Sequence, residues 1–535
     1  MSDKVFLRTA SGLVKNISGV EALLMNVVFM GFLFAFIELP FAAGLFPGAQ
    51  LPISALIVIP ASLAVAVMYG LFTMSMPRTG GEYVFVGRTI HPSVGFLVNF
   101  YFSAVLWSWI GSVVGWVPLY GLAPWFSALA VVAPTTQQAA YWTNMAALMY
   151  DPFVGFAITF VLISIGTLVV YGGAKWVIRA SYVIFAITVV AIIVYFATIL
   201  GAGHAGFVAG FNARSGTTVD AVQAAALAQV PNGFIATPIF LATFLGTLHI
   251  FLGTLGYSGN AWCAGEVKGT RTHLWAMIGA VVVFGILVWP IYYITYLVFG
   301  FDFINASSFL ATLGYPGWYE YTWAYSMPSY LIAFTTTNVW IIGLVNLAVC
   351  LVCVGSCGIV IPFLYTRNIF AWSFDRLLPS KIADLDKRGN PVWAILLMFA
   401  TAQFANFLMF FTQVFAFLLY SMLGWFIGVF IVSIAAIWYP WRRKDIFDAS
   451  PPLVKKMIGP IPLISLFGIL SLFVSIWVIV ASLTPGAIAF FVSVEYIIGM
   501  VITLIIGPVW YFAARAYWQS KGLPIHLAHK ELPPE

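Results

Sequence analysis

Two titratable side chains, Glu38 and His249, lie inside long apolar stretches of this sequence. If those stretches cross a membrane, a charge at that depth costs at least about 2.5–3.5 kcal/mol, so such a carboxyl group faces a cavity, has a partner or is protonated. The ordinary pKa of histidine lies near neutral pH, which suits a proton carrier. Glu38 and His249 are therefore candidates for ion coupling, and the alternative for each is a structural hydrogen bond.

Glycine and proline interrupt the same two stretches. The first contains Gly31 and then residues 34–40, which end in Pro40. The second contains Gly246, Gly253, Gly256 and Gly259. Interrupted membrane helices expose backbone N–H and C=O groups and are tolerated only where they line a cavity. The pattern therefore predicts a binding site beside the two interruptions.

The composition excludes a soluble fold. Of the 535 residues, 62% are hydrophobic and only 7% are charged, whereas a soluble domain carries about 25% charged residues. A membrane helix needs about 20 mostly apolar residues. The sequence contains twelve such spans: 19–46, 51–75, 94–132, 153–171, 177–201, 237–262, 274–300, 338–366, 391–411, 413–438, 461–483 and 488–514.

The basic residues support this number of spans. Of 23 Lys and Arg residues, only Arg214 lies in an odd-numbered connection. Basic residues favour the cytoplasmic side, so we expect a multi-pass protein of the cell membrane with both termini in the cytoplasm. If one span had been missed or wrongly added, the basic residues after it would fall in odd-numbered connections. The basic residues also lie in alternate loops, which argues against a nucleic-acid surface.

The two interrupted spans each open a block of five. Because five is odd, the second block enters the membrane from the opposite side, which makes the blocks an inverted repeat. The expected division is a cytoplasmic tail 1–18, a first repeat 19–201, an extracellular loop 202–236, a second repeat 237–438, a cytoplasmic loop 439–460, two further spans within 461–514 and a cytoplasmic tail 515–535. The expected fold class is thus an all-α membrane protein with discontinuous helices 1 and 6.

The cysteines predict neither a disulfide framework nor a metal site. Cys263, Cys350, Cys353 and Cys357 all lie in apolar spans, where small core packing is the simpler interpretation. We expect no resident cofactor and no catalytic residue. The six histidines are scattered and no His-Glu-x-x-His motif occurs, which disfavours a membrane-embedded enzyme.

Three predicted inner-loop segments carry a family resemblance. Residues 76–88, which read MPRTGGEYVFVGR, residues 264–268, which read AGEVK, and residues 366–379 resemble the loops of amino acid–polyamine–organocation permeases. The similarity extends from about residue 18 to about residue 514. It implies alternating access and a substrate site between the broken spans 1 and 6 and spans 3 and 8.

The resemblance also assigns substrate-binding positions. In span 1 these are Phe34, Ala35 and Phe36, where this chain lacks the glycine pair that offers backbone N–H groups to a carboxylate in the family. In span 6 the assigned positions are Phe251, Leu252, Leu255, Gly256 and Tyr257, with Gly256 on the family's break and Phe251 or Tyr257 as an aromatic gate.

The coupling ion stays open at this stage. Some proton-coupled relatives carry a lysine in span 5 where this chain has Thr188, and the family's sodium site uses two hydroxyl residues where this chain has Gly355 and Ser356. Ser356 is therefore a third ion-coupling candidate, and H⁺, Na⁺ and uncoupled exchange all remain.

The expected function is a secondary active transporter of amino acids or related amines. An uncoupled exchanger or a carrier of another small organic solute is the main alternative, and a channel or an enzyme is disfavoured. The expected partners are a small-molecule substrate and the lipid bilayer, with no nucleic acid, and the sequence leaves homo-oligomerisation open.

Overall fold

The computed structural model describes residues 12–230, 239–312, 314–315, 327–387, 389–412, 422–485, 487, 494–523, 525 and 531–532. Within these residues, twelve helices are long and apolar enough to cross a membrane. The all-α membrane fold and the number of spans expected from the sequence are thus confirmed. The inverted repeat stays a prediction.

The helices that form the twelve spans follow the chain in order. They are α1 (Gly19–Met30) with α2 (Ala35–Leu45), α3 (Leu51–Ser75), α5 (Pro92–Ser112), α8 (Pro152–Tyr171), α9 (Ala174–Arg214), α11 (Ile239–Thr254) with α12 (Gly259–Trp262), α13 (Thr270–Phe299), α16 (Val339–Cys353) with α17 (Ile361–Phe374), α18 (Val392–Phe411), α20 (Met422–Arg442), α22 (Leu463–Ser482) and α24 (Val494–Ser520).

Shorter elements connect or extend these spans. They are α4 (Glu82–Thr89), α6 (Ala123–Val131), α7 (Thr136–Leu148), α10 (Val219–Gln229), α14 (Phe301–Thr312), α15 (Pro328–Leu331), α21 (Lys444–Ala449) and a hairpin of β1 (Met457–Ile458) and β2 (Ile461–Pro462). Short 3-10 or π-helical turns lie within or between them: η2 (Phe32–Phe34), η3 (Val117–Leu122), η4 (Leu255–Ser258), η5 (Ala264–Glu266), η7 (Ile332–Phe334), η8 (Val354–Val360) and η9 (Ser380–Ala383).

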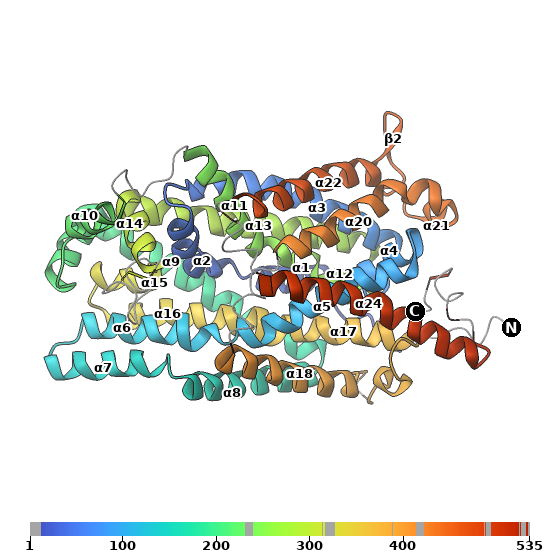
Figure 1. Cartoon of the computed structure of the whole chain (residues 1–535), viewed down its shortest axis with the longest axis horizontal. Helices are drawn as coiled ribbons and strands as arrows, with labels where there is room; N and C mark the ends of the chain where they lie inside the picture. The colour runs from blue at the N-terminus through green and yellow to red at the C-terminus, as the bar shows by residue number, and fades with distance from the viewer. Residues whose placement is uncertain are drawn as a thin grey trace.

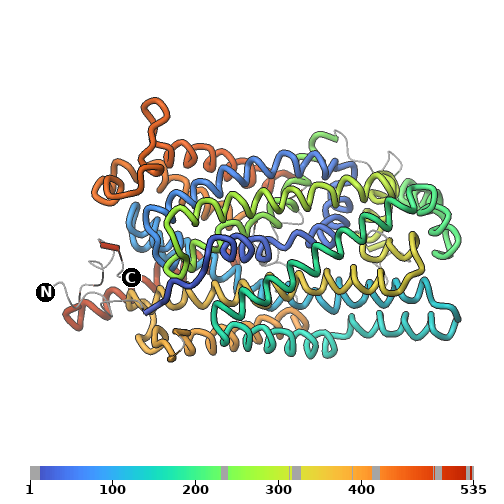
Figure 2. The backbone as a smooth tube through the Cα atoms, turned by 180° about the vertical axis from the view of Figure 1, so that it is seen from behind, coloured from blue at the N-terminus to red at the C-terminus, as the bar shows by residue number. Residues whose placement is uncertain are grey.

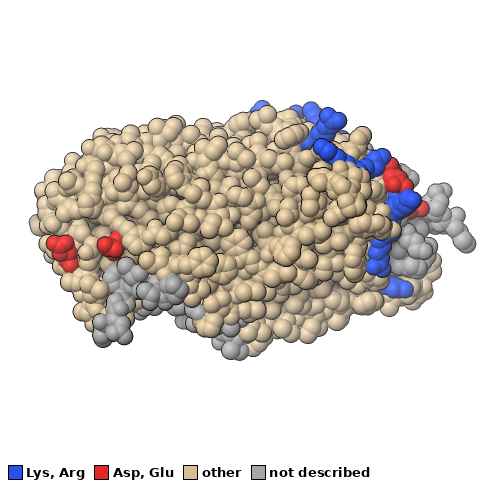
Figure 3. Space-filling view, turned by 90° about the horizontal axis from the view of Figure 1, so that it is seen from above, with Lys and Arg blue, Asp and Glu red and all other residues tan. Residues whose placement is uncertain are grey.

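The spans run roughly along the long axis of the molecule (Figure 1). The start of α1 and the end of α24 lie at one end, and α7, α10 and α14 lie at the other, as the view from behind also shows (Figure 2). On the face drawn in Figure 3, Lys and Arg gather at the end that holds the start of α1, and no charged residue is visible across the middle. We call this the basic end. The uncharged middle is typical of a surface that faces lipid.

Several spans differ in extent from their sequence prediction. The eighth continues to Phe374, beyond residue 366, and the twelfth continues to Ser520, beyond residue 514. Helix α9 continues to Arg214, beyond residue 201, with a kink at Gly203, whose φ of 62° lies in the region that favours glycine. The third span divides into α5, the π-helical turn η3 and α6.

The segment 202–214 contains three glycines as well as four alanines, so intrinsic propensity does not account for the continued helix. Packing supports it instead, because Phe207 and Phe211 are buried and contact the ring of Phe303.

Glycines in the loop after the second span allow α4 to lie tightly on α5. A Cβ atom on Gly95 would lie 2.4 Å from the backbone nitrogen of Gly87, closer than real side chains approach. The two helices therefore meet backbone to backbone. This contact explains why the segment 76–88 and the start of α5 carry glycines where the family resemblance was seen.

Candidate functional site

The first span is interrupted near its centre. Helix α1 ends at Met30, Gly31 adopts φ 61° and ψ 67°, and the turn η2 leads into α2 at Ala35. The ring of Phe34 covers Gly31, because a Cβ atom on Gly31 would lie 2.5 Å from Cε2 of Phe34. The backbone at Gly31 is therefore shielded by an aromatic ring.

The sixth span crosses the first at a similar interruption. Helix α11 gives way to the turn η4 before α12 begins. A Cβ atom on Gly256 would lie 2.5 Å from the backbone nitrogen of Met30 and 2.8 Å from the carbonyl carbon of Phe29. Only glycine permits this crossing with the backbone as it stands. Gly256 is therefore required by packing.

The side chain of Asn26 joins the two interrupted spans. Its Nδ2 donates to the carbonyl oxygen of Tyr257 at 2.9 Å and to Oδ1 of Asn260 at 3.0 Å, and its Oδ1 accepts from the backbone N–H of Asn260 at 3.0 Å. All these groups are buried. Spans 1 and 6 are thus hydrogen-bonded into one unit at their breaks.

A narrow pocket, with about 40 Å³ of space accessible to water, lies at this crossing. Aromatic side chains form much of its wall, and Glu38 is the only charged residue among the described residues that line it. The lining residues are Phe29, Met30, Phe34, Glu38, Trp109, Val113, Trp116, Leu252, Gly253, Leu255, Gly256, Ser356 and Cys357. One carboxyl group inside aromatic walls favours a ligand with a positively charged amine.

Glu38 and His249 contact each other. Oε2 of Glu38 lies 2.6 Å from Nδ1 of His249, and both side chains are buried. The ring of Phe46 packs edge-on against the imidazole. This pair joins α2 to α11, so the two ion-coupling candidates in the interrupted spans form one site that opens on the pocket through Glu38.

Ser356 lies on the opposite wall, in the π-helical turn η8. Its Oγ donates to the carbonyl oxygen of Phe29 at 2.6 Å, at the end of α1. The neighbouring Gly355 lies against Ile184 and Val28. Thr188, at the position of the family's lysine, donates to the carbonyl oxygen of Ile184 within its own helix. Aliphatic side chains therefore lie beside Gly355, at the position that the family resemblance implies for a sodium site.

The predicted substrate positions divide into two groups. Phe34, Leu252, Leu255 and Gly256 line the pocket. Ala35 is buried but does not line it, and the other three face neighbouring spans. Phe36 stacks near Tyr195, with ring centroids 4.7 Å apart, Phe251 contacts Phe426 and Trp477, and Tyr257 contacts Tyr69. Their role in substrate binding stays a prediction.

Several lining residues were not assigned from the sequence. They are Phe29, Met30, Trp109, Val113, Trp116, Gly253 and Cys357. The two tryptophans lie on the third span, seven positions apart, which is two helical turns. The family resemblance had already placed span 3 at the site. Two large aromatic side chains at helical spacing on that span were therefore the sequence signal that could have identified Trp109 and Trp116.

The fold defines a multi-span membrane protein with a pocket at the crossing of spans 1 and 6. The sequence matches the family described as "Amino acid permease" over residues 17–507. The match covers most of the chain, so the chain belongs to the amino acid permease family, which supports a transporter. A comparison with curated proteins gives no match.

Proposed function

We propose that this protein is a secondary active transporter that carries amino acids or related amines across the cytoplasmic membrane by alternating access. The observation that carries the proposal is the pocket at the crossing of spans 1 and 6, with Glu38 in its wall. A substrate ammonium group would pair with the Glu38 carboxylate and lie against the faces of Trp109 and Trp116. The basic end, where α1 begins and α24 ends (Figure 1), would face the cytoplasm.

We further propose that the coupling ion is the proton. Glu38 and His249 share a short contact that a proton can occupy, and Glu38 also faces the pocket. The proton would be shared through Oε2 of Glu38, and the other carboxylate oxygen would pair with the substrate amine, so proton and solute would cross together. Sodium is the second candidate, but its site would rest on Ser356 and backbone carbonyl groups with aliphatic neighbours at Gly355.

A ligand screen followed by uptake tests this proposal. The purified protein is heated with individual amino acids and amines, and compounds that raise its melting temperature are then tested as labelled substrates in liposomes. A ligand at 100 times its Kd stabilises a protein by about 2.7 kcal/mol. We expect stabilisation by amine-bearing solutes and uptake driven by an imposed proton gradient. If no amino acid or amine stabilises the protein or enters the liposomes, the proposed substrate class is wrong.

A further inference from the structure

At the basic end, a second carboxyl group is buried between spans. Glu82 is fully buried at the start of α4. Its Oε1 accepts from Nδ2 of Asn99 at 2.7 Å and from Nε1 of Trp262 at 2.8 Å, and its Oε2 lies 2.9 Å from the same indole nitrogen. Gly81 makes this approach feasible, because a Cβ atom there would lie 2.5 Å from Cδ1 of Trp262.

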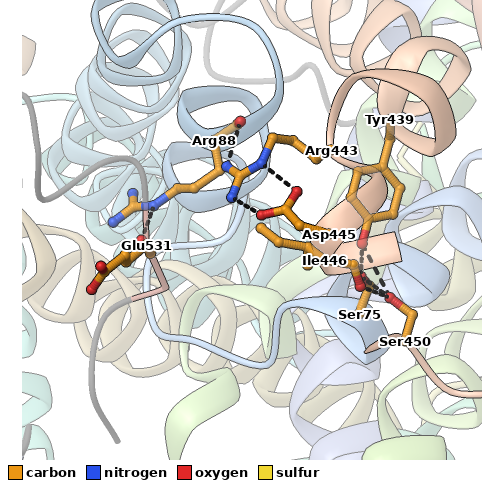
Figure 4. Close-up of polar contacts among 8 residues, drawn as sticks. All are labelled: Ser75, Arg88, Tyr439, Arg443, Asp445, Ile446, Ser450 and Glu531. Atoms are coloured by element: carbon orange, nitrogen blue, oxygen red, sulfur yellow. Dashed lines mark hydrogen bonds and ion pairs between the residues drawn. The ribbon is translucent and has the colours of Figure 1, made fainter. Parts of the chain in front are cut away.

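The helix that carries Glu82 is fastened to its surroundings. Asp375, just after α17, accepts from the hydroxyl of Tyr83 at 2.8 Å and pairs with Arg88 at 3.3 Å. Figure 4 shows a further contact of the same helix, in which Nη1 of Arg443 donates to the carbonyl oxygen of Arg88 at 3.0 Å. Helix α4 is thus tied to the ends of α17 and α20.

Asn99, which donates to Glu82, also takes part in the hydrogen bonds that join α5 to α17. Nε1 of Trp372 donates to Oδ1 of Asn99 at 2.7 Å, and Nδ2 of Asn368 donates to the hydroxyl of Ser103 at 2.9 Å. These bonds connect α5 with α17. Glu82 therefore belongs to a group of hydrogen-bonded helices, α4, α5 and α17, which we call the first body.

Trp262 belongs to a second group of hydrogen-bonded helices, α1 and α12, which we call the second body. It ends α12, which is joined to α1 through the hydrogen bonds of Asn26 with Asn260 and with the carbonyl oxygen of Tyr257. A second bridge between the bodies is the buried pair of Glu266 and Arg367, with nitrogen–oxygen distances of 2.7 and 3.0 Å. That bridge carries a permanent cation, since arginine stays protonated. Glu82, in contrast, receives only neutral donors among the described residues.

We propose that Glu82 is a proton-sensitive latch of the inner gate: the pocket opens toward the basic end only when Trp262 leaves the Glu82 carboxyl group. The inference rests on the proposed function, because alternating access requires spans 1 and 6 to part from spans 3 and 8 at this end. Parting would expose a carboxyl group that is fully buried in the closed arrangement.

The proton linkage has a definite sign. Burial raises the pKa of Glu82 from 4.5 to about 7, against the lowering effect of the hydrogen bonds from Trp262 and Asn99. On opening, water restores the pKa toward its ordinary value. The closed gate therefore binds the proton more tightly, and the open form is favoured as pH rises between about 4.5 and 7, by up to about tenfold per pH unit.

Neighbouring titratable groups do not supply this dependence. Tyr69 of α3 and Tyr257 of η4 face Glu82 electrostatically, but phenols ordinarily ionise near pH 10. On α4 the charged neighbour Arg88 is engaged with Asp375, and beyond α12 Glu266 is engaged with Arg367. Asn99 and Trp262 do not titrate in this range.

A native thiol can report the opening. Cys263 follows Trp262 and is fully buried, so its alkylation requires the inner gate to open. In a parent in which Cys350, Cys353 and Cys357 are replaced by Ala, the rate of maleimide labelling of Cys263 is measured in nanodiscs from pH 5 to 8. The variants are Glu82→Gln, which imitates the protonated group, and Glu82→Ala, which removes the latch. Asp448→Asn alters an exposed carboxyl group at the same end and serves as the control.

The ratio of parent to Glu82→Gln labelling rates cancels the pH dependence of the thiol itself. We expect this ratio to rise by up to about tenfold per unit from pH 5 to 7 and then level off. We expect Glu82→Ala to label faster than the parent at pH 5, and Asp448→Asn to match the parent. A ratio that is constant with pH, or slow labelling of Glu82→Ala at every pH, would overturn the latch.

This readout needs no substrate, so it separates two kinds of failure. If labelling behaves as expected but no amine is transported, the latch stands and the substrate class falls. If amines are transported but the labelling ratio is flat, the transport function stands and the latch falls.

Discussion

At the scale of single residues, the site depends on a carboxyl group that faces both a pocket and an imidazole. Glu38 was identifiable from the sequence because a carboxyl group inside an apolar span is costly. Its contact with His249 was not, because the two residues are 211 positions apart. Which side chains meet depends on how two interrupted helices are rotated against each other, and neither sequence segment determines that alone.

The Glu38 carboxylate can be tested by binding. We expect Glu38→Gln to weaken the binding of an amine ligand by roughly 10- to 100-fold, since a hydrogen bond to a charged group contributes about 1.5–3 kcal/mol. Calorimetric titration measures the Kd. Glu21→Gln is the matched control, because Glu21 closes a capping box at the start of α1, a role that glutamine also fills. Equal Kd values for Glu38→Gln and the control would remove Glu38 from the site.

The aromatic wall gives a second test at this scale. Trp116 lines the pocket, and its ring packs edge-on against Phe34 and Tyr120. We expect Trp116→Ala to raise the Kd for an amine by roughly 2- to 30-fold, the range of a cation–π contact worth about 0.5–2 kcal/mol. Trp107→Phe in the same span is the control, since Trp107 donates to the carbonyl oxygen of Thr401 and does not line the pocket. An unchanged Kd in Trp116→Ala would contradict the aromatic cage.

At the scale of helices, the crossing of the two interrupted spans organises the site. The glycines of span 6 indicated an interruption, but the sequence did not show that Gly256 lies against the backbone of span 1. The twelve apolar spans and the basic loops were predictable because lipid and charge act on whole segments. The extension of α9 to Arg214 was not, because nothing in the charge pattern limits how far a helix continues outside the bilayer.

This crossing predicts a strong effect of one methyl group. We expect Gly256→Ala to destabilise the protein by about 1–3 kcal/mol or more and to abolish ligand binding, because overpacking here acts on backbone atoms of span 1. Gly201→Ala in α9 is the control, since a Cβ atom there meets nothing within 4 Å. Thermal unfolding with and without ligand measures both effects. Similar melting temperatures and binding in the two variants would show that the breaks do not cross as described.

The ion pair between α17 and the segment after α12 gives another prediction. Removing one partner of a buried pair leaves an uncompensated charge, which costs about 3–5 kcal/mol. We therefore expect Arg367→Met to lower the melting temperature markedly, and the double variant Arg367→Met with Glu266→Gln to recover part of the loss. If the double variant melts at a lower temperature than the single variant, the ion pair is not the main contribution to stability at this contact.

At the scale of the whole molecule, Lys and Arg gather at the basic end on the face drawn in Figure 3, and Glu38 is the charged residue among the described residues that line the pocket. Two buried carboxyl groups, Glu38 at the pocket and Glu82 at the inner contact, then lie on opposite sides of the crossing of spans 1 and 6. A proton bound with the solute and a proton released at the basic end would make transport directional. In the proposed function, proton binding at these two carboxyl groups would couple the proton gradient to accumulation of the solute.

Proton-coupled uptake tests the central claim most directly. Proteoliposomes that contain the protein are given an inwardly directed proton gradient, and accumulation of a labelled amine is measured together with acidification of the lumen. We expect accumulation with substrate-dependent acidification in the wild type, and neither accumulation nor acidification with Glu38→Gln. Accumulation of the amine by Glu38→Gln at the wild-type rate, or a wild-type uptake that ignores the proton gradient, would contradict the central claim.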